Sequence, residues 1–261
     1  MSLVYVYGIG RTDGADDAAA ASLRGMDDGA VRIERVGDLA AFVSDVPEQE
    51  FAEAPLNANL SDMAWLAPRA VRHQEVNAAL AAALDALVPL SFGTVFRDRA
   101  GVERMLRERA AEIGPRLDRL RGKAEWIATV RRDENVARAA LESASEPLRA
   151  LRVEIGAAAP GRAYLCARRL DETVRQELRA SDAGAVVAAA EALERAGGLL
   201  FREPLIEDAG VGMIARFSVL AERRRGAPFA GDDLGAWAAR GYTLELTGPW
   251  PAYRFSTVSD G

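Results

Sequence analysis

The sequence predicts a two-domain α+β protein, and three observations support that fold class. The chain has 261 residues, enough for about two domains, and its hydrophobic fraction of 49% lets each half bury a core. Short runs of β-branched and aromatic residues, typical of strands, lie between long stretches with the apolar spacing of helices. Gly122 separates two such mixed segments, so we expect an N-terminal α+β domain in residues 1–122 and a second domain in residues 123–261.

The first domain is expected to begin with three strands. Residues 3–8 are mostly β-branched or aromatic and form the first strand. Residues 9–29 contain four glycines and five aspartates, which favours a surface loop. Apolar and charged side chains alternate over residues 30–36, which predicts a half-exposed strand, and residues 39–43 are its expected hairpin partner across a turn at Gly37.

A long helix is expected next, over residues 61–87. Ser61 or Asp62 can cap its N-terminus, and Pro89 prevents it from continuing. Its apolar stripe has spacings of 3, 4, 4 and 3 residues and consists of His73, Val76, Leu80, Leu84 and Leu87.

A short strand and a second helix complete the first domain. The strand is predicted over residues 90–96, where apolar residues follow the proline. The helix is predicted over residues 101–120, with a kink or a break at Gly114-Pro115 because proline removes a helical hydrogen bond. Its apolar face consists of Val102, Leu106, Ile113, Leu117 and Leu120.

The second domain has a recognisable order of elements. Its helical arm over residues 133–196 is interrupted at Pro147 and near Pro160. The order βαββαβ is that of the split-βαβ or ferredoxin-like arrangement, here elaborated by the length of the arm. The strands are expected at residues 124–131, 199–205, 211–222 and 242–246, with a turn at 208–210 and a second helix at 232–240.

The end of the chain carries an unusual aromatic segment. Residues 246–255 contain two prolines, a glycine and three aromatic side chains. Since proline has no backbone N–H, the last strand is not expected to continue through Pro249 and Pro251. A large apolar side chain held between two prolines, Trp250, is better suited to docking than to catalysis, and we expect it to pack on the chain's own domains.

The composition excludes several classes of protein. A net charge of −6 and a pI of about 5.1 disfavour a nucleic-acid-binding protein. One cysteine and one histidine allow no disulfide within the chain and make a zinc site improbable. We find no signal peptide and no apolar run of membrane-spanning length, so we expect a cytosolic protein without a membrane partner.

The sequence contains no recognisable catalytic constellation. His73 lies on the apolar helix stripe and is predicted to be a buried or half-buried structural residue with one hydrogen bond. Cys166 lies in an apolar helical context and is predicted to be an inert structural thiol. The glycine pair at Gly8 and Gly10 lacks the third glycine of a dinucleotide fingerprint. We therefore predict no catalytic, cofactor-binding or metal-binding residues.

Several uncommon segments together resemble the gas vesicle protein F/L family (GvpF/GvpL). The most specific are the Pro-x-x-Phe-Gly-Thr pattern within residues 88–96 and the Thr-Gly-Pro-Trp-Pro pattern within residues 246–255. Ala252 and Thr129 depart from the family's usual residues. The resemblance covers almost the whole chain and marks these residues as family motif and possible partner-binding residues: Pro89, Phe92, Gly93, Thr94, Trp126, Tyr164, Gly248, Pro249, Trp250 and Tyr253.

The resemblance implies a minor accessory protein of gas vesicle assembly, located at the vesicle or in the cytoplasm. It implies two α+β domains, the second a modified ferredoxin-like fold. It also implies binding to the small hydrophobic shell protein (GvpA-like) and to other accessory proteins, with no enzymatic activity and no cofactor. A ligand-sensing or enzymatic domain is the alternative, because ferredoxin-like folds host many functions. A deep pocket lined by several converging polar side chains would favour that alternative, and a flat apolar patch would favour assembly.

Overall fold

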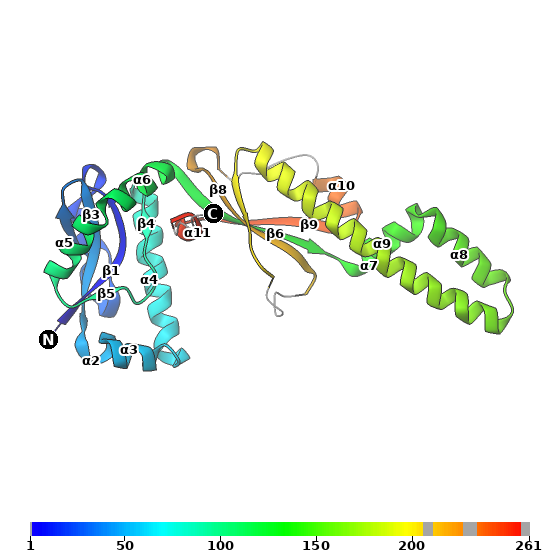
Figure 1. The fold of residues 1–261 in the computed structure, drawn as a ribbon, viewed down its shortest axis with the longest axis horizontal. Helices are drawn as coiled ribbons and strands as arrows, with labels where there is room; N and C mark the ends of the chain where they lie inside the picture. The colour runs from blue at the N-terminus through cyan, green and yellow to red at the C-terminus, as the bar shows by residue number, and fades with distance from the viewer. Residues whose placement is uncertain (1, 206–210, 227–233, 257–261) are drawn as a thin grey trace. The chain divides into compact units, whose positions relative to one another are not determined.

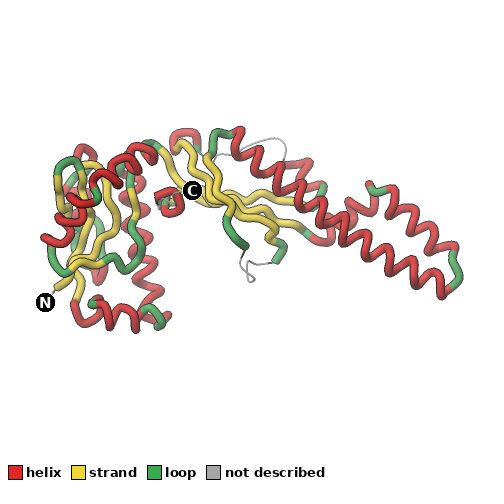
Figure 2. Tube along the Cα trace, viewed as in Figure 1, coloured by secondary structure: helices red, strands yellow, loops and turns green. Residues whose placement is uncertain are grey.

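A computed structural model describes residues 2–205, 211–226 and 234–256 (Figures 1 and 2). Its residues group into two compact units. Unit 1 comprises residues up to Glu125 together with Glu222–Arg224 and the C-terminal segment from Pro249, and unit 2 comprises the rest. Both units combine helices with a sheet, so the mixed α and β class predicted from the sequence is correct.

Unit 1 is built on an antiparallel sheet with β1 (Ser2–Arg11) in its interior. β3 (Leu39–Pro47) pairs along the length of β1, and β2 (Arg32–Val36) pairs with the outer side of β3 in the predicted hairpin. β4 (Val88–Pro89) and β5 (Val95–Phe96) pair with the other side of β1. Of the strand expected over residues 90–96 only β5 is present, because residues 90–94 leave β1 in a turn, and β4 precedes the expected range.

Both faces of this sheet are covered, which explains the continuous apolar character of β1. Tyr5 and Tyr7 lie in one core with Val76 and Leu80 of α4 (Met63–Ala83), the long helix predicted from the sequence and capped by Asp62. Two further helices, α5 (Arg99–Glu108) and α6 (Ala110–Leu120), also belong to unit 1. Of these, α5 contacts β2 and β3.

Three local features of unit 1 differ from the sequence-based expectation. The expected loop after β1 contains α1 (Asp17–Ser22), which Asp16 caps through its side chain. Two further short helices, α2 (Glu48–Phe51) and α3 (Glu53–Asn59), precede α4. The break between α5 and α6 falls at Arg109 and not at Gly114-Pro115, since α6 accommodates the proline.

Unit 2 contains a four-stranded sheet in the order β7-β8-β6-β9. Its strands are β6 (Lys123–Arg132), β7 (Leu199–Arg202), β8 (Met213–Glu222) and β9 (Tyr242–Trp250). Buried residues of β6 and β8 pack with Val186, Ala189 and Leu193 to form the main core of the unit. The predicted turn at 208–210 and the first residues of the predicted helix 232–240 lie outside the described residues, and α10 is described over Leu234–Ala239.

A helical arm with its own small core extends this unit. α7 (Glu134–Ala144), α8 (Glu146–Ala157) and α9 (Pro160–Arg195) begin and end close to the predicted interruptions. Leu148 and Leu151 of α8 pack against Leu170, Val174 and Leu178 on the first half of α9. The second half of α9 packs on the sheet, so one helix of 36 residues serves two cores.

The C-terminal segment differs from the sequence-based expectation in where its last strand ends and in the unit with which it groups. β9 continues through Pro249 to Trp250, which is possible because β9 is an edge strand and the missing N–H need not serve a ladder. From Pro249 onward the described residues group with unit 1, whereas the sequence analysis placed them in the second domain. Phe255 in α11 (Tyr253–Ser256) accepts a hydrogen bond at its carbonyl from Arg119, and the Arg254 N–H donates to Glu125.

Candidate functional site

The Pro-x-x-Phe-Gly-Thr segment forms a turn that main-chain bonds hold against β1. The Leu90 N–H donates to the Tyr7 carbonyl at 2.8 Å, and the Val6 N–H donates to the Thr94 carbonyl at 2.9 Å. Gly93 has φ +83°, a conformation that favours glycine and reverses the chain at this point. The turn is thus part of the sheet at both of its ends.

A buried hydrogen-bond network lies directly beneath the turn. The hydroxyl of Tyr5 accepts the N–H of Gly93 at 3.1 Å and lies 2.8 Å from Nδ1 of His73. The tautomer of the His73 ring sets which of these two atoms donates to the other. Nε2 lies 3.2 Å from the carbonyl oxygen of Leu90. Tyr5 and His73 therefore bind both sides of the turn.

The same network reaches the C-terminal segment through Asn77. Its amide nitrogen lies 3.0 Å from Nε2 of His73 and donates to the hydroxyl of Tyr253 at 3.1 Å. The imidazole and the Tyr253 ring also lie face to face at a tilt, with centroids 6.4 Å apart. Two motif segments more than 150 residues apart in the sequence thus meet at one histidine.

Burial decides the charge state of these groups. His73 is 4% exposed, and its burial lowers its pKa to about 4 against the opposing effect of the Leu90 carbonyl. Burial likewise raises the pKa of Tyr5, and it raises the pKa of Tyr253 to about 12. At neutral pH the network is uncharged, so it is suited to holding segments together and not to proton transfer.

Aromatic side chains surround the network. The ring of Phe92 packs edge-on against Tyr5, His73 and Trp65, with centroids 5.7–6.4 Å apart. Phe51 packs against Tyr5 and Trp65 from α2. These contacts attach the short helices α2 and α3, which the sequence analysis missed, to the same turn.

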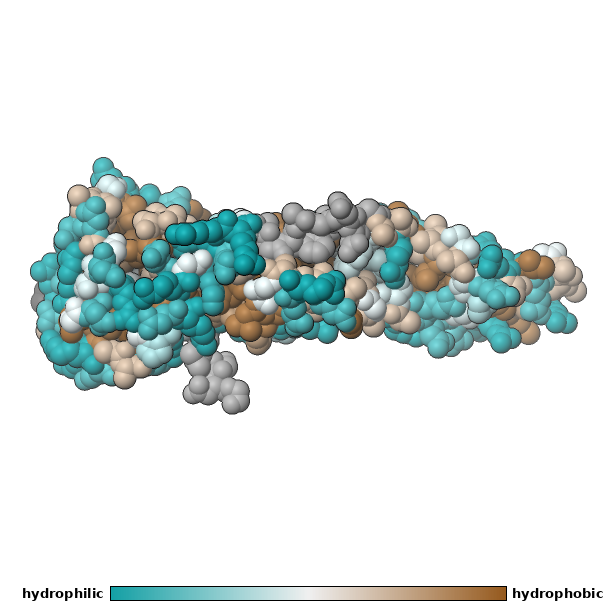
Figure 3. Space-filling model, turned by 90° about the horizontal axis from the view of Figure 1, so that it is seen from above, coloured by the Kyte–Doolittle hydropathy of each residue, from teal (hydrophilic) through white to brown (hydrophobic). Residues whose placement is uncertain are grey.

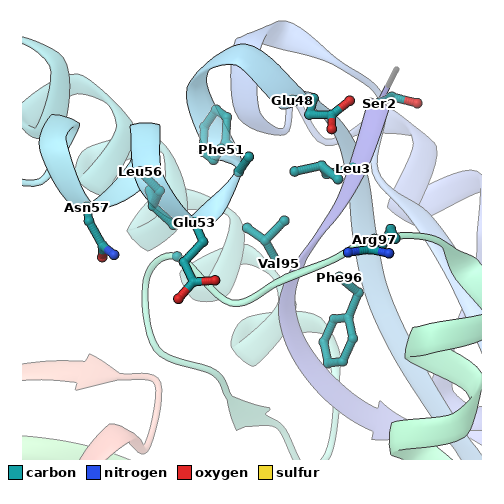
Figure 4. Close-up of a pocket in the computed structure, with 12 residues that line it drawn as sticks. Ser2, Leu3, Glu48, Phe51, Glu53, Leu56, Asn57, Val95, Phe96 and Arg97 are labelled. Atoms are coloured by element: carbon teal, nitrogen blue, oxygen red, sulfur yellow. The ribbon is translucent and has the colours of Figure 1, made fainter.

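A groove of about 730 Å³ lies between these short helices and the strands β1 and β5 (Figure 4). Figure 4 shows Leu3 and Val95 side by side at the groove, with Leu56 on the α3 side. The polar side chains Glu48, Glu53, Asn57 and Arg97 come from the surrounding elements. The groove is lined by Ser2, Leu3, Glu48, Phe51, Ala52, Glu53, Leu56, Asn57, Gly93, Val95, Phe96 and Arg97. It is the candidate functional site of unit 1.

The structure divides the predicted motif residues into separate groups. Phe92 and Tyr253 pack against His73, and Gly93 bonds to Tyr5. Pro89 pairs with Gly8, and the Thr94 carbonyl accepts from Val6, at the two ends of the same turn. Of these motif residues only Gly93 lines the groove. The remaining predicted residues lie elsewhere: Trp126 in the core of unit 2, Tyr164 on the arm, and Gly248, Pro249 and Trp250 in β9.

The motif residues that lie away from His73 differ in their exposure to solvent. Tyr164 is 64% exposed and Trp250 is 41% exposed, whereas Trp126 is buried and its indole N–H has no hydrogen-bond partner among the described residues. Figure 3 shows apolar residues in small separate areas among polar ones on the face that it draws. No single exposed apolar surface on that face therefore competes with the groove as a candidate.

Sequence reasoning missed Tyr5, Asn77 and the groove residues Phe51 and Leu56. Asn77 offered a signal, because a polar residue one turn after His73 interrupts the inner face of α4. Within residues 2–205, 211–226 and 234–256, no group of three or more potential metal ligands is present, and no helix has the length and hydropathy to cross a membrane.

Comparisons with known proteins agree along nearly the whole chain. Residues 3–257 match the family model described as "Gas vesicle synthesis protein GvpL/GvpF". The chain is 32% identical to "Gas vesicle protein L" of Streptomyces sp. (strain CB03234), covering 99% of this chain and 94% of that protein. It is 31% identical to "Gas vesicle protein F" of the same organism, over 96% of this chain and 98% of that protein.

A solved structure shows the same fold. The crystal structure of gas vesicle protein GvpF from Anabaena sp. PCC7120 superposes with a TM-score of 0.70 at 16% identity, covering 99% of this chain and 100% of that chain. The family model and the relatives confirm the resemblance carried by the sequence motifs, and this structure agrees in fold.

Proposed function

The chain belongs to the GvpL/GvpF family of gas vesicle synthesis proteins, and from that membership we propose that it is a minor accessory protein of vesicle assembly that binds the hydrophobic shell subunit. The observation that carries the proposal is the match of residues 3–257 to the family model, and the groove of unit 1 supports it. The groove presents apolar side chains beside the turn that bears the most specific family pattern. An apolar groove of this kind can cover apolar surface of a shell subunit before the subunit joins the shell.

We propose further that the two units are independent domains and that the second is a modified ferredoxin-like fold. The strand order β7-β8-β6-β9 supports this, since the first strand of the unit lies between the third and fourth, as in a split βαβ arrangement. The arm of α8 and the first half of α9 is then an insertion with its own core. Its exposed residues Tyr164 and Leu165 are suited to contacts with other accessory proteins of the vesicle.

The proposed function makes a direct prediction about the shell subunit. A tagged full-length chain, co-expressed with the shell subunit, is expected to keep that subunit in the supernatant after centrifugation and to retain it on the affinity resin. The control is the shell subunit expressed with an unrelated tagged acidic protein of similar size. Equal sedimentation of the shell subunit in both cultures, with none retained by the chain, would contradict the proposal.

A further inference from the structure

We propose that the groove of unit 1 binds an extended polypeptide segment in which a lysine or arginine lies between apolar side chains. The inference rests on the proposed function in one respect: the shell subunit is the protein that supplies the segment. The groove then gives that interaction a location and a chemistry, which family membership does not.

The interior of the groove selects apolar side chains. Leu3 and Phe51 are largely covered by the core, and Leu56 and Val95 are half-buried, so the interior is apolar but not closed. Its volume of about 730 Å³ exceeds what one side chain fills, and it accommodates several residues of a chain laid along it. Side chains at alternate positions of an extended segment can enter it while the others face water.

The backbone beside the groove can bind such a segment. β5 pairs with β1 on one side, and among the described residues no strand pairs with its other side. The pairing of β5 with β1 ends at Val4. Ser2 and Leu3 of β1 therefore continue beyond the end of β5 and line the groove. An incoming segment can therefore add main-chain hydrogen bonds at a sheet edge, which favours an extended conformation.

The charge at the margin selects a basic residue. Glu48 begins α2 and Glu53 begins α3. Among the described residues that line the groove, Arg97 is the one cation. Glu53 is exposed and has no ion pair within the part of the chain that the structure describes. A lysine or arginine between apolar side chains would meet a carboxylate next to apolar surface, where the attraction is stronger than in open water.

The test uses two groove variants and one matched control in the full-length chain. Glu53→Arg reverses the charge at the margin, and Asn57→Trp fills the groove from an exposed position without removing core packing. Glu172→Arg on α9 is the control, because Glu172 is another exposed glutamate on a helix surface. Thermal unfolding first establishes that all variants retain the wild-type fold.

Retention of the shell subunit then separates the two proposals. We expect each groove variant to retain about tenfold less shell subunit than the wild type at 0.15 M salt, and Glu172→Arg to retain the wild-type amount. Wild-type retention by both folded groove variants would overturn the groove inference and leave the proposed function intact. Absence of retention by the wild-type chain would overturn both.

Photo-crosslinking identifies the occupant. A benzophenone amino acid at position 57 of the full-length chain is expected to crosslink to a shell-subunit peptide that contains a lysine or arginine between apolar residues. A crosslink to a peptide without a basic residue, to a second copy of this chain, or at no higher yield than from position 172 would overturn the inference.

Discussion

The hydroxyl of Tyr5 lies 2.8 Å from Nδ1 of His73, and this contact joins the first strand to the long helix of unit 1. Through the same two residues the turn at Leu90–Gly93 is bound from below. A histidine that looks like one member of an apolar stripe is thus the centre of a polar network. Its neutral form is required, because burial strongly disfavours the imidazolium.

The ionisation of His73 should therefore make the protein less stable in mild acid. Its pKa is about 4 in the folded chain and about 6.5 when unfolded, so between these values the unfolded state binds more protons. This destabilisation is absent above pH 6.5 and grows as the pH falls toward 4. There it lowers the free energy of unfolding by about 3 kcal/mol. Because the chain has one histidine, a single imidazole NMR signal reports this pKa directly. A midpoint near 6.5 in the folded protein would contradict the structure.

Tyr5→Phe should destabilise unit 1 while leaving its shape unchanged. The variant deprives the Gly93 N–H and the His73 ring of a partner, which costs about 2 kcal/mol when such groups are buried. Tyr164→Phe removes the same atom from an exposed position and should leave thermal and urea unfolding unchanged. Equal effects of the two variants would show that the buried hydroxyl adds little.

The C-terminal segment should depend on Phe255 more than on Trp250. Phe255 is 8% exposed and Trp250 is 41% exposed, so truncation of the phenylalanine leaves the larger cavity. We expect Phe255→Ala to cost about 3 kcal/mol and Trp250→Ala about 1 kcal/mol in urea unfolding. The reverse order would mean that Trp250, and not Phe255, anchors the segment.

Gly241→Ala should lower the stability of the protein more than Gly122→Ala does. Both glycines have positive φ, +79° and +67°, so each alanine pays about 1 kcal/mol of backbone strain. A Cβ at Gly241 would also lie 2.5 Å from the backbone nitrogen of Ala137, whereas one at Gly122 meets nothing within 4 Å. Thermal unfolding should show a clearly larger loss for Gly241→Ala, and similar losses would indicate that α7 moves away without cost.

Local patterns along the chain were enough to predict several of its strands and helices. The alternation of residues 30–36, the stripe of α4, and the interruptions at Pro147 and Pro160 placed strands and helices close to their observed positions, because each depends on side-chain period or on proline chemistry within a few residues. The motif segments also sufficed to identify the family, since they carry uncommon residues in a fixed order.

Where those elements meet depends on packing between distant parts of the chain, which no local pattern shows. Glu48–Asn59 lacks a periodic pattern, and α2 and α3 depend on the packing of Phe51 and Leu56 against the turn. β9 tolerates Pro249 because it lies at a sheet edge, a position that no local pattern encodes. Tyr253 and Asn77 lie 176 residues apart, and their hydrogen bond exists only because burial brings both to His73. The groove likewise arises from packing between segments that are far apart in the sequence, so no local pattern predicts it.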